Sequence, residues 1–131
     1  MLVEEIMTPV ERLIIVPQMS SVRAALQKMK ISRVRSLVVE KNGTHGAYGL
    51  VTFKNILQSI VAEDGDIDLL NVYDIAASPS ISVSAKLDVK YAARMMVQGS
   101  IKRLLVIDNN ELQGLLTMTD IIAVLMDEVE S

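Results

Sequence analysis

The stretch Gly49-Leu50-Val51-Thr52-Phe53-Lys54-Asn55-Ile56 returns 65 positions later as Gly114-Leu115-Leu116-Thr117-Met118-Thr119-Asp120-Ile121. A glycine, two apolar residues, a threonine and then an amide or carboxylate three positions on are typical of a strand that ends in a turn and opens a helix. We call each copy a Gly-x-x-Thr box. The repetition predicts that each half of the chain is one folding unit and that the two units pair.

The repeat continues on the N-terminal side of both boxes. Leu37 corresponds to Leu104 at an offset of 67 positions, and Val3 corresponds to Val72 at an offset of 69, so short insertions separate the matching segments. Each half has about half of the residues that a small domain needs, so neither should bury its apolar face alone. We expect repeat 1 at residues 1–66, including a linker, and repeat 2 at residues 67–131.

Each repeat is predicted to contain a strand, a helix, two strands and a second helix, which gives a mixed α+β or α/β fold. In repeat 1 the strands are expected at 13–16, 37–39 and 48–51, with a first helix capped by Ser20 or Ser21 and a second at 54–62. In repeat 2 the strands are expected at 81–83, 104–107 and 112–116, with helices from 89 and over 121–129. Periodicity predicts that the helix at 54–62 faces inward with Ile56, Leu57, Ile60 and Val61.

Composition narrows the class of protein. Half of the 131 residues are hydrophobic and only 3% are aromatic, so the core must be aliphatic, with eight methionines as adaptable packing residues. The absence of cysteine excludes a disulfide scaffold, a cysteine-ligated zinc site and a thiol nucleophile. A net charge of −3 argues against nucleic-acid binding. Apolar runs are short and no signal peptide is visible, so we expect no membrane span and a cytoplasmic location.

The second box has the chemistry to bind a sugar and a phosphate. An ionised Asp120 only accepts hydrogen bonds, so it can accept from both hydroxyls of a ribose. The Thr117 hydroxyl and the free amides at the start of a helix can face a phosphate. The same Thr-x-x-Asp spacing is also a helix-capping pattern, so a purely structural role stays open.

The residues give little support to an enzyme or to a metal site. His45 is the only histidine and lies in a polar, glycine-rich stretch, where a surface loop residue is expected. Asp64, Asp66 and Asp68 alternate in the linker but lack the glycine and terminal glutamate of a calcium loop. No nucleophile and base are evident. We therefore expect no catalytic residues and no metal.

Taken together, the motifs resemble a tandem pair of cystathionine-β-synthase (CBS) domains, known as a Bateman module. The resemblance covers nearly the whole chain and is carried by both boxes and by three further motifs: Ile6-Met7-Thr8-Pro9, Arg35-Ser36-Leu37-Val38-Val39 and Lys102-Arg103-Leu104-Leu105-Val106-Ile107-Asp108. It implies two pseudo-symmetric units packed sheet to sheet, clefts that bind adenine nucleotides, and homodimers formed through the helices.

The same resemblance implies roles for individual residues. Asp120 would bind the ribose and Thr117 the ribose or phosphate, while Ile81 and Val83 would flank the base above Leu115. The phosphate would be reached by Lys102, Arg103, Arg35 and Ser36. A second, weaker site would comprise Thr52, Asn55, Ile14, Val16 and Leu50. Asn55 lacks the charge of a carboxylate, so the Asp120 site is expected to be the better one.

These features favour a regulatory module that binds AMP, ADP, ATP or S-adenosylmethionine and signals by rearranging the units or a homodimer. Mg²⁺ is expected only alongside ATP, and a partner protein in trans is a further expectation. The alternative is a structural module for dimerisation or protein interaction with vestigial clefts. Asn55 favours this alternative, as does Leu87 at the position where repeat 1 has Ser20.

Overall fold

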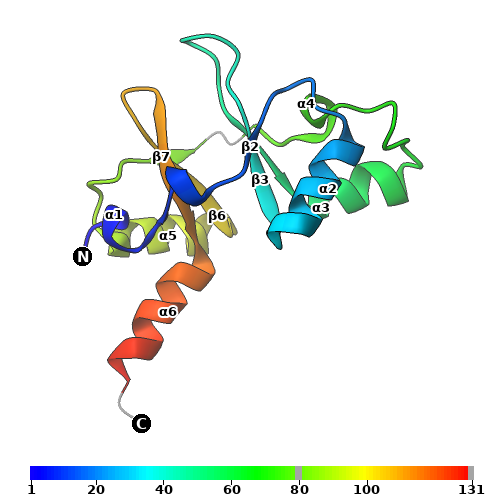
Figure 1. Cartoon of the computed structure of the whole chain (residues 1–131). Coiled ribbons are helices and arrows are strands. Elements are labelled where there is room, and N and C mark those ends of the chain that lie inside the picture. The colour runs from blue at the N-terminus through cyan, green and yellow to red at the C-terminus, as the bar shows by residue number, and fades with distance from the viewer. Residues whose placement is uncertain (79–80, 130–131) are drawn as a thin grey trace. The chain divides into compact units, whose positions relative to one another are not determined.

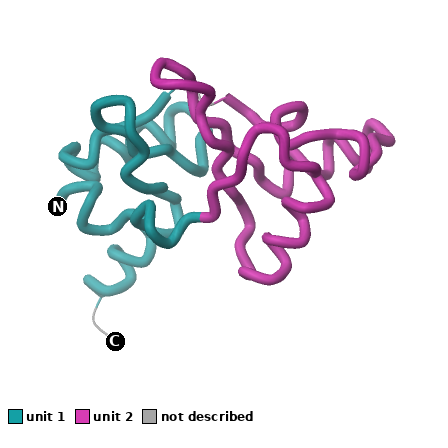
Figure 2. Tube along the Cα trace, turned by 45° about the horizontal axis from the view of Figure 1, so that its top comes forward, with its two compact units in different colours: residues 1–13, 80–131 teal, residues 14–79 magenta. Residues whose placement is uncertain are grey.

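Two sheets with their own helices form the protein in a computed structural model that describes residues 1–78 and 81–129. The contacts divide the chain into unit 1, made of Met1–Leu13 and Ser80–Ser131, and unit 2, made of Ile14–Pro79 (Figure 2). These units are not the two sequence repeats. Unit 1 combines the first residues of repeat 1 with most of repeat 2, and unit 2 combines the rest of repeat 1 with the start of repeat 2.

Unit 2 is built on a three-stranded sheet in the order β2-β3-β4. Its strands are β2 (Ile15–Val16), β3 (Ser36–Val39) and β4 (Gly49–Thr52), with β2 parallel and β4 antiparallel to β3. Its helices are α2 (Val22–Ser32), α3 (Phe53–Ile56), the π-helix η2 (Leu57–Ala62) and α4 (Val72–Ile75). The Ser21 hydroxyl caps α2 by accepting from the Ala24 amide at 3.1 Å, as predicted.

Unit 1 is built on a four-stranded sheet in the order β1-β7-β6-β5. Its strands are β1 (Thr8–Pro9), β5 (Ser82–Val83), β6 (Arg103–Asp108) and β7 (Glu111–Thr117). Its helices are α1 (Val3–Ile6), the 3₁₀ turn η1 (Val10–Arg12), α5 (Val89–Gly99) and α6 (Met118–Glu128). Figure 1 shows α6 continuing directly from the end of β7.

Each unit has an aliphatic core on one face of its sheet. In unit 2 the buried side chains of α2 pack on alternate residues of the strands. These strand residues include Val16, Leu37 and Val51. In unit 1 the equivalent core contains Met96, Leu104 and Leu116. Because successive side chains of a strand point to opposite faces, the remaining strand residues lie on the other face of each sheet.

A short helix from each repeat packs on the core that the other repeat builds. In unit 1 the amide of Val3 donates to the carbonyl of Leu87 at 2.8 Å, and in unit 2 the amide of Val72 donates to the carbonyl of Ser20 at the same distance. The amide of Glu4 likewise donates to the carbonyl of Ala85. Val3 corresponds to Val72 and Leu87 to Ser20 in the repeat, so the two attachments are equivalent. Leu87 therefore accepts the same backbone hydrogen bond as Ser20, although the two side chains differ.

The predicted order of strands and helices is confirmed in both repeats, but one helix face was predicted wrongly. The helical segment starts at Phe53 and ends in the π-helix at Ala62. Ile56 is buried and Ile60 packs against the core, as predicted. Leu57 and Val61 are 59% and 65% exposed instead, because the core covers only one side of a broad apolar face. No helix within residues 1–78 and 81–129 is long and apolar enough to cross a membrane.

Candidate functional site

The second Gly-x-x-Thr box forms a reciprocal cap at the start of α6. The Thr117 amide donates to Oδ2 of Asp120 at 2.9 Å, and the Asp120 amide donates to Oγ1 of Thr117 at 3.1 Å. The capping role left open by the sequence is therefore confirmed. Within the described part of the chain, Oδ1 of Asp120 has no hydrogen-bond partner, and the Thr117 hydroxyl donates to none. The cap thus leaves an acceptor and a donor available for a ligand.

The first box makes the same cap with an amide in place of the carboxylate. The Thr52 amide donates to Oδ1 of Asn55 at 2.8 Å, and the Thr52 hydroxyl donates to the same oxygen at 3.0 Å. The Asn55 amide donates to Oγ1 of Thr52 at 3.4 Å. Asparagine therefore supports the fold as aspartate does, while the Thr52 hydroxyl proton is used within the box.

Basic residues lie directly across the sheet from the second box. Arg103 is the cross-strand partner of Thr117, so both side chains share one face of the sheet. The carbonyl of the preceding Lys102 accepts from the Met118 amide at 3.1 Å. Lys102 is exposed and Arg103 half-buried, and neither is in an ion pair among residues 1–78 and 81–129. Arg103 is therefore an unpaired cation on the face of Thr117, and the unpaired Lys102 precedes it in the chain.

The first box has a similar but weaker basic neighbour. Ser36 is the cross-strand partner of Thr52, and the exposed Arg35 precedes it. Leu50 and Leu115 are buried two residues before the threonines and so lie on the same faces as them. Within its own unit, each box thus has a basic neighbour and a leucine on the same face. The sequence analysis assigned Arg35 and Ser36 to the Asp120 site, whereas within unit 2 they lie next to Thr52, and their assignment to the Asp120 site stays a prediction.

The expected base-flanking valines are core residues. Val16 and Val83 belong to the two hydrophobic cores, so their side chains lie on the opposite sheet faces from the threonines. Val83 pairs with Val106, and Ser82 pairs with Leu105. Ser82 therefore lies on the same sheet face as Leu105 and Thr117. A ligand on that face would meet the backbone of β5 and the Ser82 side chain. Ile15 has the place in β2 that is equivalent to Ser82. Ile14 packs against the core of unit 2, and Ile81 is an exposed residue.

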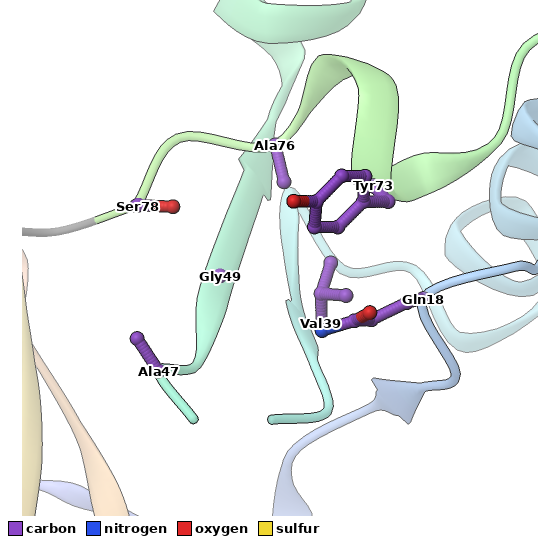
Figure 3. Close-up of a pocket in the computed structure, with 7 residues that line it drawn as sticks. All are labelled: Gln18, Val39, Ala47, Gly49, Tyr73, Ala76 and Ser78. Atoms are coloured by element: carbon purple, nitrogen blue, oxygen red, sulfur yellow. The ribbon is translucent and has the colours of Figure 1, made fainter. Parts of the chain in front are cut away.

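Unit 2 contains a cavity that no sequence motif predicted. It has a volume of about 200 Å³ and lies at the Gly49 end of β4, away from Thr52 (Figure 3). The Tyr73 amide donates to the Gln18 carbonyl at 3.1 Å, which holds α4 next to the residue that follows β2. The lining residues are Gln18, Val39, Ala47, Gly49, Tyr73, Ala76 and Ser78. Only long-range pairing brings these residues together, so no local motif marks them.

Unit 1 contains a second hollow, an apolar groove of about 340 Å³ between α5 and α6. It is lined by Met1, Val89, Lys90, Ala93, Ile121, Val124, Leu125 and Glu128. Leu125 and Met126 of α6 are 53% and 70% exposed, so apolar side chains extend from the groove onto the surface. Met126 is thus a surface residue, whereas Met96 fills the core.

A metal centre finds no support in the described ranges, 1–78 and 81–129, where no three His, Asp or Glu side chains are placed to share an ion. Asp108 is a half-buried carboxylate with a perturbed pKa. A hydrogen bond from the Ser84 hydroxyl, and then one from the Ala85 amide at 3.0 Å, lowers the pKa of Asp108. Through these two hydrogen bonds Asp108 stabilises the loop after β5, which is a structural role.

Comparison with known proteins supports the resemblance found in the sequence. The family model described as the CBS domain matches twice, at residues 3–62 and 72–127. An uncharacterized protein of Methanopyrus kandleri is 31% identical over 98 residues, which cover 74% of this chain and 50% of that protein. The chain therefore spans about half the length of this curated relative.

Solved structures share the whole fold. A hexameric CBS-CP12 protein from bloom-forming cyanobacteria matches with a TM-score of 0.85 and 29% identity. The match covers 100% of this chain and 76% of the CBS-CP12 chain. CBSX2, crystallised in complex with AMP, has a TM-score of 0.81 and 21% identity, covering 98% of this chain and 99% of its own.

Proposed function

The chain belongs to the CBS domain family as a tandem pair, a Bateman module, and from this premise we propose that it is a regulatory module that binds an adenine nucleotide through the Thr117–Asp120 box. The observation that carries the proposal is the free Oδ1 of Asp120 in a cap whose Thr117 lies opposite the unpaired Arg103, with the unpaired Lys102 next to Arg103 in the chain. Carboxylate and guanidinium groups in one place suit a ligand that has both hydroxyls and a phosphate.

In this proposal each side chain has a distinct role. Ribose hydroxyls donate to Oδ1 of Asp120, while its Oδ2 stays in the cap of α6. The Thr117 hydroxyl donates to a ligand oxygen, and Arg103 and Lys102 neutralise the phosphate. A hydrogen bond to a charged group contributes about 1.5–3 kcal/mol, so the carboxylate alone is worth at least a tenfold change in affinity.

Calorimetric titration with AMP, ADP, ATP and S-adenosylmethionine tests the proposal. We expect Asp120→Asn to weaken binding by at least about tenfold through loss of the charge-assisted hydrogen bonds. The variant should keep its melting temperature, because Asn55 caps the equivalent helix with an amide. Lys102→Ala should weaken ATP more than AMP. Absence of both heat and thermal stabilisation at millimolar ligand would refute nucleotide binding.

A homodimer is a second candidate function that a specific observation favours. The apolar groove between α5 and α6, with the exposed Leu125 and Met126, is the kind of surface that a second copy covers. Sedimentation with and without AMP separates the two ideas. A dimer that Leu125→Asp dissociates and that ignores every nucleotide would favour the structural role. A dimer whose sedimentation changes with AMP would combine both functions.

A further inference from the structure

The two boxes differ in the side chain that lies over the glycine that begins them. Gly49 and Gly114 are equivalent in the repeat, and each lies beneath the residue that follows a short helix of its unit. A Cβ placed on Gly114 would lie 2.7 Å from the Sδ atom of Met7. A Cβ placed on Gly49 would lie 3.2 Å from the Cβ atom of Ala76. Met7 and Ala76 are equivalent at the same offset of 69 that relates Val3 to Val72.

The difference between methionine and alanine has a visible consequence. The Met7 side chain reaches over Gly114 and packs against the core of unit 1. The Ala76 side chain ends at its methyl group, and the cavity of unit 2 lies next to it and Gly49 (Figure 3). The flexible thioether of methionine is suited to filling such a gap. Ala76 therefore leaves open in unit 2 a space that Met7 occupies in unit 1.

The cavity has the size and chemistry for one ring system. Its volume of about 200 Å³ exceeds the roughly 150 Å³ that admits benzene and falls short of the 300 Å³ or more typical of pockets for larger ligands. Its polar side chains are neutral: the Gln18 amide, the Tyr73 phenol and the Ser78 hydroxyl. Val39, Gly49 and Ala76 form an apolar wall. An uncharged planar heterocycle with donor and acceptor groups fits these walls, and an amide such as that of Gln18 can pair with its edge.

We propose that Ala76 opens, and Met7 closes, a ring-sized binding cavity beside the glycine of its unit. In unit 2, Ala76 admits a heterocyclic ring such as the base of a nucleoside. In unit 1, Met7 fills the equivalent place, so no ring enters beside Gly114. The two glycines lie on the opposite sheet faces from the threonines, so this inference does not rest on the proposed nucleotide function and a free base tests it.

Three probes separate the parts of this proposal in the ¹⁵N-labelled full chain followed by NMR. Free adenine should shift the amides of Gly49 and Ala77 and leave those of Thr117 and Asp120 unchanged. Ribose 5-phosphate should do the reverse. AMP should shift both sets of amides, because it carries both the base and the sugar phosphate.

Reciprocal variants test the two residues directly. Ala76→Met should weaken the adenine response of Gly49 by at least tenfold, and Met7→Ala should give Gly114 a response that the natural chain lacks. Ala76→Val, which adds less volume, and Tyr73→Ala, at a largely exposed residue, provide tests if Ala76→Met fails to fold. Melting temperatures of all variants identify loss of structure.

The outcomes distinguish this inference from the proposed function. Adenine binding at Gly49 that Ala76→Met leaves intact would overturn the inference, as would the absence of any adenine response in the natural chain. If AMP and ribose 5-phosphate fail to bind while adenine binds and Ala76→Met abolishes it, the nucleotide function of unit 1 is wrong and the role of Ala76 stands.

Discussion

At the scale of single residues, the two glycines of the boxes have unequal packing roles. Gly114 is paired with Pro9 across the β1–β7 ladder, and the chain of β1 passes directly over it. A Cβ on Gly114 would lie 2.4 Å from the backbone oxygen of Thr8. A backbone atom held in a ladder cannot move aside as the tip of a side chain can. The glycine is thus required by the close approach of β1.

Gly114→Ala should therefore destabilise the protein more than Gly49→Ala. We expect Gly114→Ala to lower the free energy of unfolding by about 1–3 kcal/mol, the usual effect of overpacking. Gly49→Ala should have a smaller effect, because its nearest neighbours are the Cβ atoms of Ala76 and Val39 at 3.2 and 3.3 Å. Urea unfolding of both variants measures the difference. Equal losses would show that β1 can shift away from Gly114.

Residue chemistry could be predicted from the sequence where one local pattern determines it. The Thr117 and Asp120 cap follows from four consecutive residues, and the structure confirms it. The contrast between Met7 and Ala76 could not be predicted, since it depends on which segment lies over each glycine. The basic pair at the start of β6 lies between these cases, because a hairpin register places Arg103 opposite Thr117.

At the scale of elements, the order of strands and helices could be predicted from apolar periodicity, while the facing of one helix could not. Phe53, Leu57 and Val61 repeat every four residues and are all exposed in the segment formed by α3 and η2. Periodicity shows that a helix is apolar on a broad face but does not show how much of that face its own core covers.

The loop after β5 gives unit 1 a pH-sensitive attachment. The Ser84 hydroxyl and the Ala85 amide lower the pKa of Asp108 below its usual range. A carboxylate of this kind stabilises the fold above its unfolded pKa of about 3.9 and loses that contribution as the pH falls through the lower folded value. The natural chain should therefore lose stability below about pH 4.

Asp108→Asn should reduce this loss, because the amide does not titrate. The free energy of unfolding of the variant, measured by urea from pH 6 to pH 2.5, should fall less steeply below about pH 4 than that of the natural chain. Asp64→Asn is the matched control, since it removes the same charge from an exposed residue with a φ of 56°, which asparagine tolerates. An identical acid profile for Asp108→Asn and the natural chain would contradict the assignment.

At the scale of the whole molecule, the sequence repeats and the compact units are different divisions of one chain. The sequence predicts a break near residue 66, whereas the contacts assign Met1–Leu13 to the unit that holds most of repeat 2. Each short helix is held in the other repeat's unit by backbone hydrogen bonds, such as those to the Leu87 and Ser20 carbonyls. No side-chain pattern therefore predicts this exchange of helices. Each repeat supplies a short helix to the other and cannot complete its unit alone.

This exchange predicts that equivalent core mutations act in opposite units. Val3 and Val72 are both fully buried, Val3 in the core with Met96 and Val72 in the core with Met29. Valine-to-alanine changes at such sites cost about 2 kcal/mol, which raises the rate of amide exchange that follows local opening by roughly 30-fold. Val3→Ala should accelerate hydrogen exchange in α5, β6 and β7, and Val72→Ala should accelerate it in α2 and β3. Hydrogen-exchange mass spectrometry locates each effect, and the two variants serve as controls for each other. Faster exchange of α2 and β3 in Val3→Ala, with α5 unchanged, would mean that each repeat folds with its own helix and that the exchange of helices is wrong.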